Sequence, residues 1–372
     1  MTADTHDLPG WRGGWLNRLV ARPGFQSWAA RFPLTRGRAR ADGAALFEIV
    51  QGFVHSQVLM ALVELDIPRR LRAGPQTAQT LGKACAVAPE RMQVLLQAGA
   101  AQGLLKRKRN GSYGLARQGA ALMGVPGLEA MIRHHKAFYD DLRDPVALLR
   151  GEDETRLARF WPYVFGGEID PVEAATYSDL MAQSQRLVAE DTLRAVPLKG
   201  VTHLMDVGGG TGAFLEAAGA AAPGMQMTLF DLPQVVPDAQ ARFDAAGMTR
   251  RVQIVPGSFR DQPLPQGADA ISLVRVLYDH ADDTVRDLLG KVHDALPPGG
   301  RLIVSEPMGG GRTPQRAGDV YFAFYTMAMQ TGRARSAAEI GALLRAAGFE
   351  QIKSPTPARA YVTRVVTAVR PT

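Results

Sequence analysis

Hydrophobic residues recur at three- and four-residue intervals through the first half of the chain, which is the spacing of helices that bury one face. The pattern is clearest over residues 45–66, where it predicts a buried helix. Downstream, we expect a short helix over 77–86 and a second helix that begins at Pro89, because proline is favoured in the first turn of a helix. Asn110 and Gly111 then predict a two-residue hairpin turn between short strands. Helices followed by a hairpin in this order are typical of a winged-helix domain.

From residue 201 the pattern changes, and short apolar runs alternate with amphipathic ones. Such alternation predicts a parallel α/β sheet with helices on both faces. A last pair of strand-like runs around 350–369, separated by SPTPARA, predicts an antiparallel pair at the edge of the sheet. The other strand-like runs are 202–207, 225–232, 252–257, 269–277 and 301–308, and the helical runs are 212–222, 233–247, 282–295 and the stretch up to 348.

Composition narrows the class of protein. The 372 residues are 46% hydrophobic and 21% charged, which fits a folded globular chain and excludes disordered and fibrous classes. No uninterrupted apolar run approaches the roughly 18 residues of a membrane-spanning helix, and the first residues lack the plan of a signal peptide. The single cysteine, Cys85, excludes an intramolecular disulfide and a cysteine-based metal site. These features predict a cytoplasmic protein.

The positive charge, +7 overall, is concentrated near the N-terminus. Residues 1–44 carry seven arginines among tryptophan, phenylalanine and leucine side chains. Such a basic aromatic arm either packs on the body or on a second subunit, or lies on a membrane surface. A peripheral contact with a membrane therefore stays open. The basic run 106–109 beside the hairpin is interpreted as a solvated wing, so no nucleic-acid partner is expected.

A glycine-rich segment supplies the strongest chemical signal. The segment 206–212, Asp-Val-Gly-Gly-Gly-Thr-Gly, ends a strand and opens a helix. Glycines let the backbone approach a ligand, and the helix N-terminus supplies unpaired N–H groups. A dinucleotide site fits this loop only loosely. Asp206, Gly208, Gly210 and Gly212 match every position of the acidic and glycine pattern used to bind S-adenosylmethionine.

Two further segments favour S-adenosylmethionine over a dinucleotide. Asp231, next to Leu232, ends the following strand, where a carboxylate can accept both ribose hydroxyls. Ser258 and Phe259 follow a third strand, where enzymes of this kind hold the adenine. The terminal strand pair also replaces the second half of a dinucleotide fold. Arg275 is a candidate for the cofactor carboxylate.

With these motifs in place, the chain resembles the class I methyltransferases, and more narrowly the O-methyltransferase family of acetylserotonin and plant phenol methyltransferases. The resemblance covers about residues 45–370 and includes SLVRVLYDHADD (272–283), PPGGRLIVSEPM (297–308) and GRARSAAEIGALLRAAGF (332–349). It implies a Rossmann-like α/β domain that binds S-adenosylmethionine and an N-terminal, mainly α winged-helix domain that forms a homodimer. The expected layout is an arm over 1–44, a helical dimerisation domain over 45–195 and a methyltransferase domain over 196–372.

Within this family, the chain resembles the bacterial carotenoid branch most closely. The resembling segments are 25–36, 47–63, 144–152, 159–163, 230–235 and 274–280. This implies methyl transfer to the tertiary hydroxyl at carbon 1 of an acyclic carotenoid, hydroxyneurosporene or demethylspheroidene. Three alternatives stay open: methylation of a ring carbon in a bacteriochlorophyll precursor, O-methylation of another small molecule, and a winged-helix regulator.

The catalytic segment departs from the family pattern. The phenol enzymes place a basic histidine at the position of Tyr278 and a supporting glutamate at the position of Ala334. A tyrosine is a poor base near neutral pH. Asp279 and His280 are the nearest titratable alternatives, and His280 is either the base or a residue at the start of a helix. We expect the proton to leave a tertiary alcohol late in the transition state.

The acceptor pocket is expected to be long and apolar, because methionine and aromatic side chains adapt to a flexible ligand. Core packing is the alternative interpretation. The candidates are Phe322, Tyr325 and Met329, together with Phe160, Trp161, Tyr163 and Met181. His134 and His135 are adjacent on a helix and point to different faces, so no metal site is expected.

Overall fold

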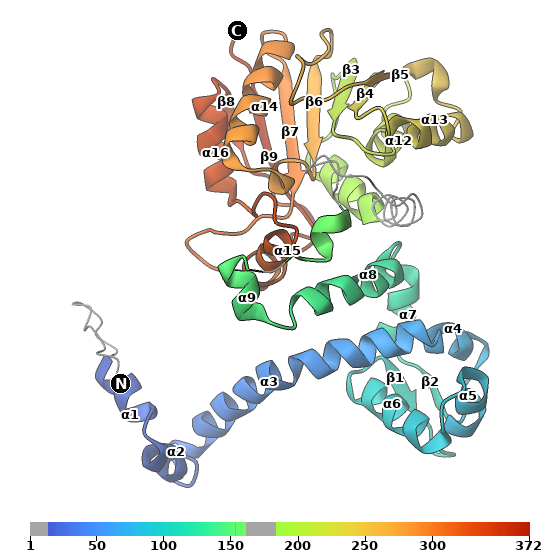
Figure 1. The fold of residues 1–372 in the computed structure, drawn as a ribbon, viewed down its shortest axis with the longest axis vertical. Coiled ribbons are helices and arrows are strands. Elements are labelled where there is room, and N and C mark those ends of the chain that lie inside the picture. Colours follow the sequence, from blue (N-terminus) through green and yellow to red (C-terminus); the bar gives the residue numbers. More distant parts are fainter. Residues whose placement is uncertain (1–13, 153, 161–183) are drawn as a thin grey trace. The chain divides into compact units, whose positions relative to one another are not determined.

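The computed structural model describes residues 14–152, 154–160 and 184–372. Its internal contacts divide the chain into two compact units, Met1–Ala120 and Ala121–Thr372, and each is described by itself. The ribbon in Figure 1 labels the elements of both.

The first unit consists of helices and one small hairpin. Its elements are α1 (Gly14–Val20), α2 (Pro23–Ala29), α3 (Arg36–Glu64), α4 (Ile67–Arg70), η1 (Leu71–Ala73), α5 (Ala78–Cys85), α6 (Pro89–Ala101), β1 (Leu105–Arg107) and β2 (Tyr113–Leu115), and α7 (Arg117–Gly124) begins within it. The predicted helix starts are confirmed: the Thr77 side chain accepts a hydrogen bond from the N–H of Thr80, and Pro89 opens α6. Leu62, Leu81, Met92 and Leu96 bury their side chains in one core, joined by Tyr113 from the hairpin.

The hairpin differs from the prediction in its loop. β1 and β2 pair antiparallel from Leu105–Leu115 to Arg107–Tyr113, so five residues connect them instead of two. The Asn110 side chain accepts hydrogen bonds from the backbone N–H and the hydroxyl of Ser112. This Asx-type turn uses the asparagine side chain where a two-residue turn would use its backbone.

Helix α3 is longer and more exposed than predicted. Among its residues only Met60, Leu62 and Val63 are buried. Along its first half, exposed apolar side chains form the face that we call the α3 face, made of Leu46, Phe47, Ile49, Val50, Phe53 and Val54. Among the described residues, α3 alone has the length and mean hydropathy of a membrane span, a criterion that core helices of globular proteins also meet.

The second unit contains a seven-stranded mixed sheet. Its strands are β3 (His203–Val207), β4 (Gln226–Asp231), β5 (Val252–Pro256), β6 (Ala270–Val274), β7 (Arg301–Glu306), β8 (Glu350–Lys353) and β9 (Arg364–Val369). Their order is β5-β4-β3-β6-β7-β9-β8, and only the pairs that include β9 are antiparallel. The predicted α/β sheet with an antiparallel edge is therefore confirmed.

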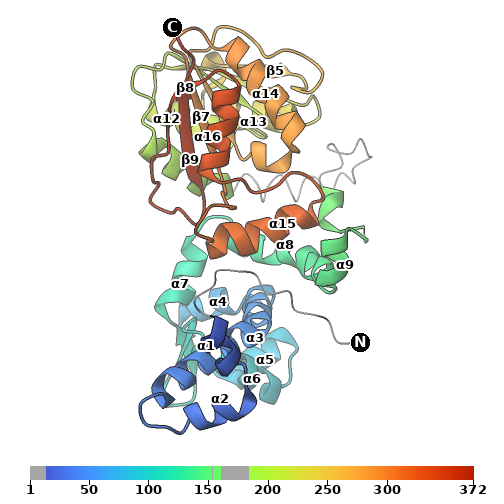
Figure 2. The ribbon, with the colours of Figure 1, turned by 90° about the vertical axis from the view of Figure 1, so that its left-hand side faces the viewer.

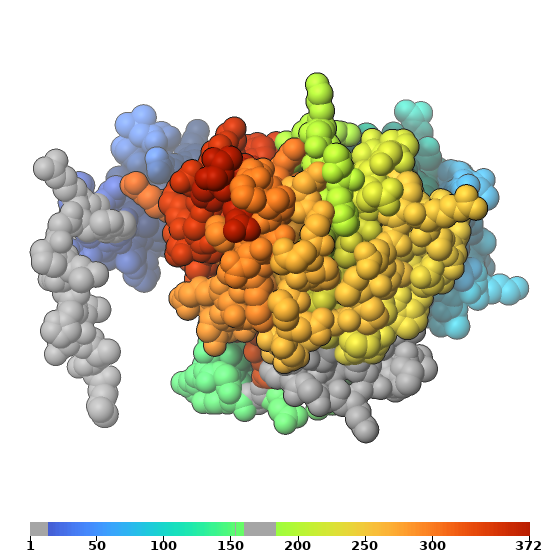
Figure 3. All heavy atoms as spheres, turned by 90° about the horizontal axis from the view of Figure 1, so that it is seen from above, coloured from blue at the N-terminus to red at the C-terminus, as the bar shows by residue number. Residues whose placement is uncertain are grey.

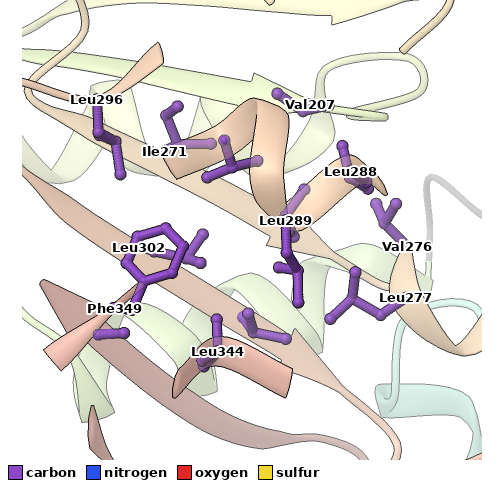
Figure 4. Close-up of a cluster of buried hydrophobic side chains, with 14 of the residues drawn as sticks. Val207, Ile271, Val276, Leu277, Leu288, Leu289, Leu296, Leu302, Leu344 and Phe349 are labelled. Carbon is purple, nitrogen blue, oxygen red and sulfur yellow. The ribbon is translucent and has the colours of Figure 1, made fainter. Parts of the chain in front are cut away.

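Helices cover both faces of this sheet, as Figures 1 and 2 show. One face packs against α14 (Asp282–Ala295) and α16 (Ala337–Ala346). Figure 4 shows Leu288 and Leu289 of α14 and Leu344 of α16 in one cluster with Ile271 and Leu302 of the sheet. The other face packs against α12 (Ala213–Ala221), α13 (Val236–Ala245) and the helical segment 184–195. Drawn as spheres in Figure 3, the segments from yellow-green to red pack into one continuous body.

The remaining elements of the second unit are α8 (Leu128–Asp141), α9 (Pro145–Arg150), η2 (Leu157–Phe160), η3 (Thr249–Arg251), η4 (Leu277–Asp279), the π-helical turn η5 (Arg316–Phe322) and α15 (Ala323–Ala328). A small core joins α8, α9 and η2 to α15 through Phe138, Leu148, Leu157 and Met329. The internal contacts divide the chain near residue 120, and the predicted domain boundary at 195 stays a prediction. Segments 128–160 and 184–195 have amphipathic helical patterns, and such patterns do not say which core a helix packs against.

Candidate functional site

The glycine loop joins β3 to α12 and needs its glycines for two physical reasons. Gly208, Gly210 and Gly212 have φ values of 68°, 58° and 78°, a region that other residues enter only with strain. At Gly212 a Cβ atom would also lie 2.3 Å from the ring of Phe243. The backbone N–H of Gly208 donates to the carbonyl of Phe230 at 2.8 Å, which fastens the loop to β4.

Asp231 closes this loop from the end of β4. Its Oδ2 accepts the N–H of Gly210 at 2.6 Å, and its Oδ1 accepts the N–H of Leu232 at 2.7 Å. Burial raises the pKa of Asp231, and the two N–H donors oppose that shift. Each carboxylate oxygen has a second lone pair, so two hydroxyl donors can still bind. The predicted loop residues and Asp231 therefore lie together.

Asp206 is fully buried at the end of β3, although it carries a carboxyl group. The hydroxyl of Ser272 on β6 donates to its Oδ1 at 2.6 Å. Its Oδ2 is buried and accepts no hydrogen bond from the described residues. Burial raises the pKa of Asp206 to about 7, with a further contribution from the charge of Asp231. This oxygen therefore lacks a donor such as an amino group. S-adenosylmethionine, the cofactor that the glycine motif predicts, carries an amino group. Ser272 was not predicted, because its partner comes from a different strand.

The loop after β5 places Ser258 and Phe259 beside the segment after β6. The N–H of Gly257 donates to the carbonyl of Asp231 at 2.8 Å, which brings the two loops together. The Phe259 ring stands edge-on to the ring of His280, with centroids 5.3 Å apart. Asp231 is the carboxylate expected to bind the ribose, and an aromatic ring in the neighbouring loop suits a flat base such as adenine.

Arg275 leaves the end of β6 in a strained conformation. Its φ is 57°, although it is not glycine. Its N–H donates to the carbonyl of Ser305 at 2.8 Å, and its Nη1 donates to the hydroxyl of Ser184 at 3.0 Å. Its Nε is buried and has no acceptor among the described residues, which leaves a donor for an anionic group.

Tyr278 and Asp279 follow on the short helix η4, and Glu306 ends the neighbouring strand β7. Oε2 of Glu306 accepts the N–H of Tyr278 at 3.2 Å. Tyr278 and Glu306 are buried, and burial raises the pKa of Tyr278 well above its usual value and that of Glu306 to about 7. Burial and the charge of Glu306 together raise the pKa of Asp279 well above its usual value. Glu306 was not predicted, because nothing in its apolar strand indicates that it lies near Tyr278 and Asp279.

The surroundings of His280 lower its ability to accept a proton. Nη2 of Arg260 lies 3.2 Å from its Nδ1. An arginine only donates, so this nitrogen accepts and the ring proton sits on Nε2. Burial, with Arg260 and Arg335 adding their charge, lowers the pKa of His280 to about 4. The lowered pKa makes His280 a weak proton acceptor, and its ring contacts that of Phe259.

The acceptor candidates that the structure describes gather around α15. Tyr325 and Met329 are buried with Phe138 in the core that joins α8 to α15, and Phe322 stands edge-on to Tyr321. The backbone of Phe160 ends η2. Trp161, Tyr163 and Met181 lie outside the described residues.

His134 and His135, the adjacent histidines of α8, each contact the hydroxyl of a tyrosine. His134 Nε2 lies 2.9 Å from the hydroxyl of Tyr325, and His135 Nε2 lies 2.7 Å from that of Tyr321. Burial lowers the pKa of both histidines, that of His134 to about 4. In the part of the chain that the structure describes, no group of three or more potential ligands can hold a metal ion.

Comparisons with known proteins agree with this geometry. An O-methyltransferase domain matches residues 139–350, and an O-methyltransferase dimerisation domain matches residues 47–124. The chain is 58% identical to demethylspheroidene O-methyltransferase of Cereibacter sphaeroides, over 95% of this chain and 94% of that protein. It is 31% identical to acetylserotonin O-methyltransferase of Mus musculus, over 87% of this chain and 88% of that protein.

A solved structure shares the fold and its ligand chemistry. A methyltransferase of calicheamicin biosynthesis, in its S-adenosylhomocysteine-bound form, superposes with a TM-score of 0.74 at 25% identity and covers 89% of this chain and 98% of its own. The expected cofactor, S-adenosylmethionine, and the expected homodimer are thereby confirmed. With a methyltransferase domain, a dimerisation domain and relatives along nearly its whole length, the chain belongs to the family of S-adenosylmethionine-dependent O-methyltransferases.

Proposed function

We propose that the protein transfers a methyl group from S-adenosylmethionine to the tertiary hydroxyl at carbon 1 of an acyclic carotenoid, hydroxyneurosporene or demethylspheroidene. The observation that carries this proposal is the 58% identity, over 95% of the chain, to an enzyme named for demethylspheroidene. The lack of a basic group at Tyr278 and of a carboxylate at Ala334 supports an acceptor other than a phenol. The layout of arm, dimerisation domain and methyltransferase domain remains our proposal for the division of the chain.

The cofactor fits the polar atoms that the site leaves available. Oδ2 of Asp206 would accept from the amino group, Nε of Arg275 would bind the carboxylate, and the second lone pairs of Asp231 would accept the ribose hydroxyls. Gly208, Gly210 and Gly212 let the backbone come close, and Leu232, Ser258 and Phe259 would flank the adenine. When bound, the cofactor supplies an electrophilic methyl group on a sulfonium.

The residues around α15 would line the acceptor pocket. Phe322 is partly exposed and would offer aromatic surface to a long polyene, and the buried Tyr325 and Met329 would lie behind it. Phe160, Trp161, Tyr163 and Met181 stay candidates for the same pocket from the sequence alone. Alignment of the acceptor oxygen with the methyl group supplies most of the acceleration, because an oriented pair reacts as a single molecule. A tertiary alcohol then loses its proton as the new bond forms.

The basic aromatic arm would bring the enzyme to the acceptor, which is lipid-soluble. The described part of the arm exposes Trp15, Trp28, Phe32 and Leu34, and the rings of Trp28 and Phe32 stack at 4.7 Å. Residues 14–44 of the arm contain one acidic residue, Asp42, and six arginines: Arg18, Arg22, Arg31, Arg36, Arg38 and Arg40. A basic and aromatic segment of this kind binds anionic membrane surfaces. The enzyme would then work in the cytoplasm at the membrane surface.

A methyl-transfer assay tests the acceptor. Purified protein with methyl-labelled cofactor is offered 1-hydroxyneurosporene, demethylspheroidene, a bacteriochlorophyllide and a catechol. The proposal expects label in the carotenoids as an ether. Label only in the chlorin or the catechol contradicts it.

Vesicle flotation tests the arm. Replacing Arg18, Arg22 and Arg31 by glutamine should weaken binding to phosphatidylglycerol vesicles at low salt. The same change at the exposed Arg72, Arg107 and Arg109 removes equal charge and should weaken it less. Equal losses in the two variants exclude a specific role for the arm.

A further inference from the structure

The carboxyl groups of Asp279 and Glu306 form a buried pair that has no role in the proposed function so far described. They end neighbouring parallel strands, with Asp279 five residues beyond Val274 of β6 and Glu306 at the end of β7. Oδ1 of Asp279 and Oε1 of Glu306 are both buried, and neither has a hydrogen-bond partner among the described residues. Glu306 accepts the N–H of Tyr278, the residue before Asp279, so the two carboxyl groups lie in the same small region of the fold. Buried carboxyl oxygens without donors are costly unless a proton or a cation lies near them.

The surrounding charges do not neutralise this pair by direct bonding. Arg335 is near Glu306, but its guanidinium donates to Asp282 and to the carbonyls of Leu277 and His280. Arg275 is near Asp279, and its Nη1 donates to Ser184.

The other titratable groups around the pair are phenols. Tyr278 precedes Asp279 on η4, and Tyr325 on α15 lies near Tyr278. Burial raises the pKa of Tyr278 well above its usual value, so its phenol is neutral near pH 7. Repulsion between two ionised carboxylates therefore favours a shared proton.

The proposed reaction changes the charge of this site by one unit. The bound cofactor carries a positive sulfur before methyl transfer and a neutral sulfur afterwards. During the transfer, the acceptor oxygen forms a bond to the methyl carbon, the carbon–sulfur bond breaks with its electron pair on sulfur, and the hydroxyl proton must leave.

We propose that Asp279 and Glu306 together balance the positive sulfur of the cofactor while ionised, and take up the proton of the acceptor hydroxyl when that charge is lost. This inference rests on the proposed function, since it needs a hydroxyl acceptor. The pair would do the work of the histidine and glutamate that Tyr278 and Ala334 replace. The neighbouring groups are poorer acceptors: Tyr278 is a buried phenol, and Nδ1 of His280 is occupied by Arg260.

Titration calorimetry tests the charge coupling without an acceptor. S-adenosylmethionine and S-adenosylhomocysteine differ in the sulfur charge and share their other titratable groups. Each is titrated into the full-length protein near pH 7 in buffers of different ionisation enthalpy, which gives the number of protons released. We expect S-adenosylmethionine to release up to about one proton more than S-adenosylhomocysteine, and their affinity ratio to rise by at most about tenfold per pH unit through this range.

Two variants and one control assign the proton. Glu306→Gln and Asp279→Asn each leave a single carboxyl group, so the difference in proton release should fall to near zero. The exposed Glu350→Gln makes the same chemical change at the sheet edge and should keep the wild-type difference. Circular dichroism shows whether each variant folds, and either variant alone suffices.

Equal proton release by both ligands in the wild-type protein overturns the inference, as does a difference that survives both substitutions. A proton difference without label transfer to a carotenoid would retain the charge coupling and reject the acceptor of the proposed function. Single-turnover rates then test proton uptake: Glu306→Gln should remove the ionisation near pH 7 from the rate profile.

Discussion

Nη2 of Arg260 lies 3.2 Å from Nδ1 of His280, and this contact limits the ability of His280, a candidate general base, to accept a proton. The guanidinium fills the lone pair through which the neutral imidazole would accept a proton. It also adds to the effect of burial, which lowers the pKa of His280 to about 4. Loss of the histidine should therefore cost packing against Phe259 rather than proton transfer.

Replacing His280 with asparagine should lower the single-turnover rate by less than about tenfold and leave its pH dependence in place. A general base usually contributes on the order of 10²- to 10⁴-fold. Rapid-quench measurement of one turnover between pH 5.5 and 9 checks this. A larger loss that disappears at high pH would restore His280 as the base.

Gly212→Ala should lower both the free energy of unfolding and the affinity for the cofactor. The φ of 78° disfavours alanine, and the added Cβ would lie 2.3 Å from the Phe243 ring. Overpacking of this kind costs about 1–3 kcal/mol, and the left-handed backbone adds about 1–2 kcal/mol. Urea unfolding and calorimetric titration with the cofactor give the two values. Gly290→Ala on α14 is the control, because its Cβ would meet nothing within 4 Å. A Gly212→Ala variant as stable as the control contradicts this prediction.

Stability without cofactor should fall as the pH rises from about 5 to 7.5. The pKa values of Asp206 and Glu306 are about 7 in the folded chain, above the usual values of unfolded carboxyl groups. The folded state thus binds more protons than the unfolded state in this window, and the unfolding free energy drops with rising pH. Thermal unfolding at several pH values measures the slope. Asp206→Asn should flatten it, and an unchanged slope in that variant excludes Asp206 as a source.

The sequence predicted the parts of the fold that depend on local pattern. Apolar alternation gave the strands and helices of the second unit, and the glycine pattern found the loop that Asp231 closes. Contacts between distant segments could not be predicted in this way. Ser272 bonds to Asp206 only because β6 pairs with β3, and Glu306 comes near Asp279 only because β7 lies next to β6.

The exposure of α3 could not be predicted from the sequence either. Its apolar residues have the spacing and composition of a buried helix, yet those of the α3 face are open to solvent in the single chain. Periodicity shows that a helix has an apolar face, and it does not show whether the same chain covers that face. The dimerisation domain begins at residue 47, so all of the α3 face except Leu46 falls within the part of the chain that forms the homodimer.

Phe53→Asp should therefore separate the homodimer. The Phe53 side chain is 70% exposed in the single chain and makes few contacts there, so a charge should leave the fold of the subunit intact. In an interface, the same aspartate would be buried without a partner, which costs several kcal/mol. Light scattering after size-exclusion chromatography measures the mass, and circular dichroism reports the fold.

Val320→Asp serves as the matched control. Val320 is 60% exposed and lies on η5, outside the dimerisation domain. It should keep the dimer mass, because an exposed aspartate stays solvated. A dimer that survives Phe53→Asp with unchanged concentration dependence would show that the subunits meet through another surface. Monomers from both variants would point instead to a general loss of stability, because the two substitutions share nothing but the added charge.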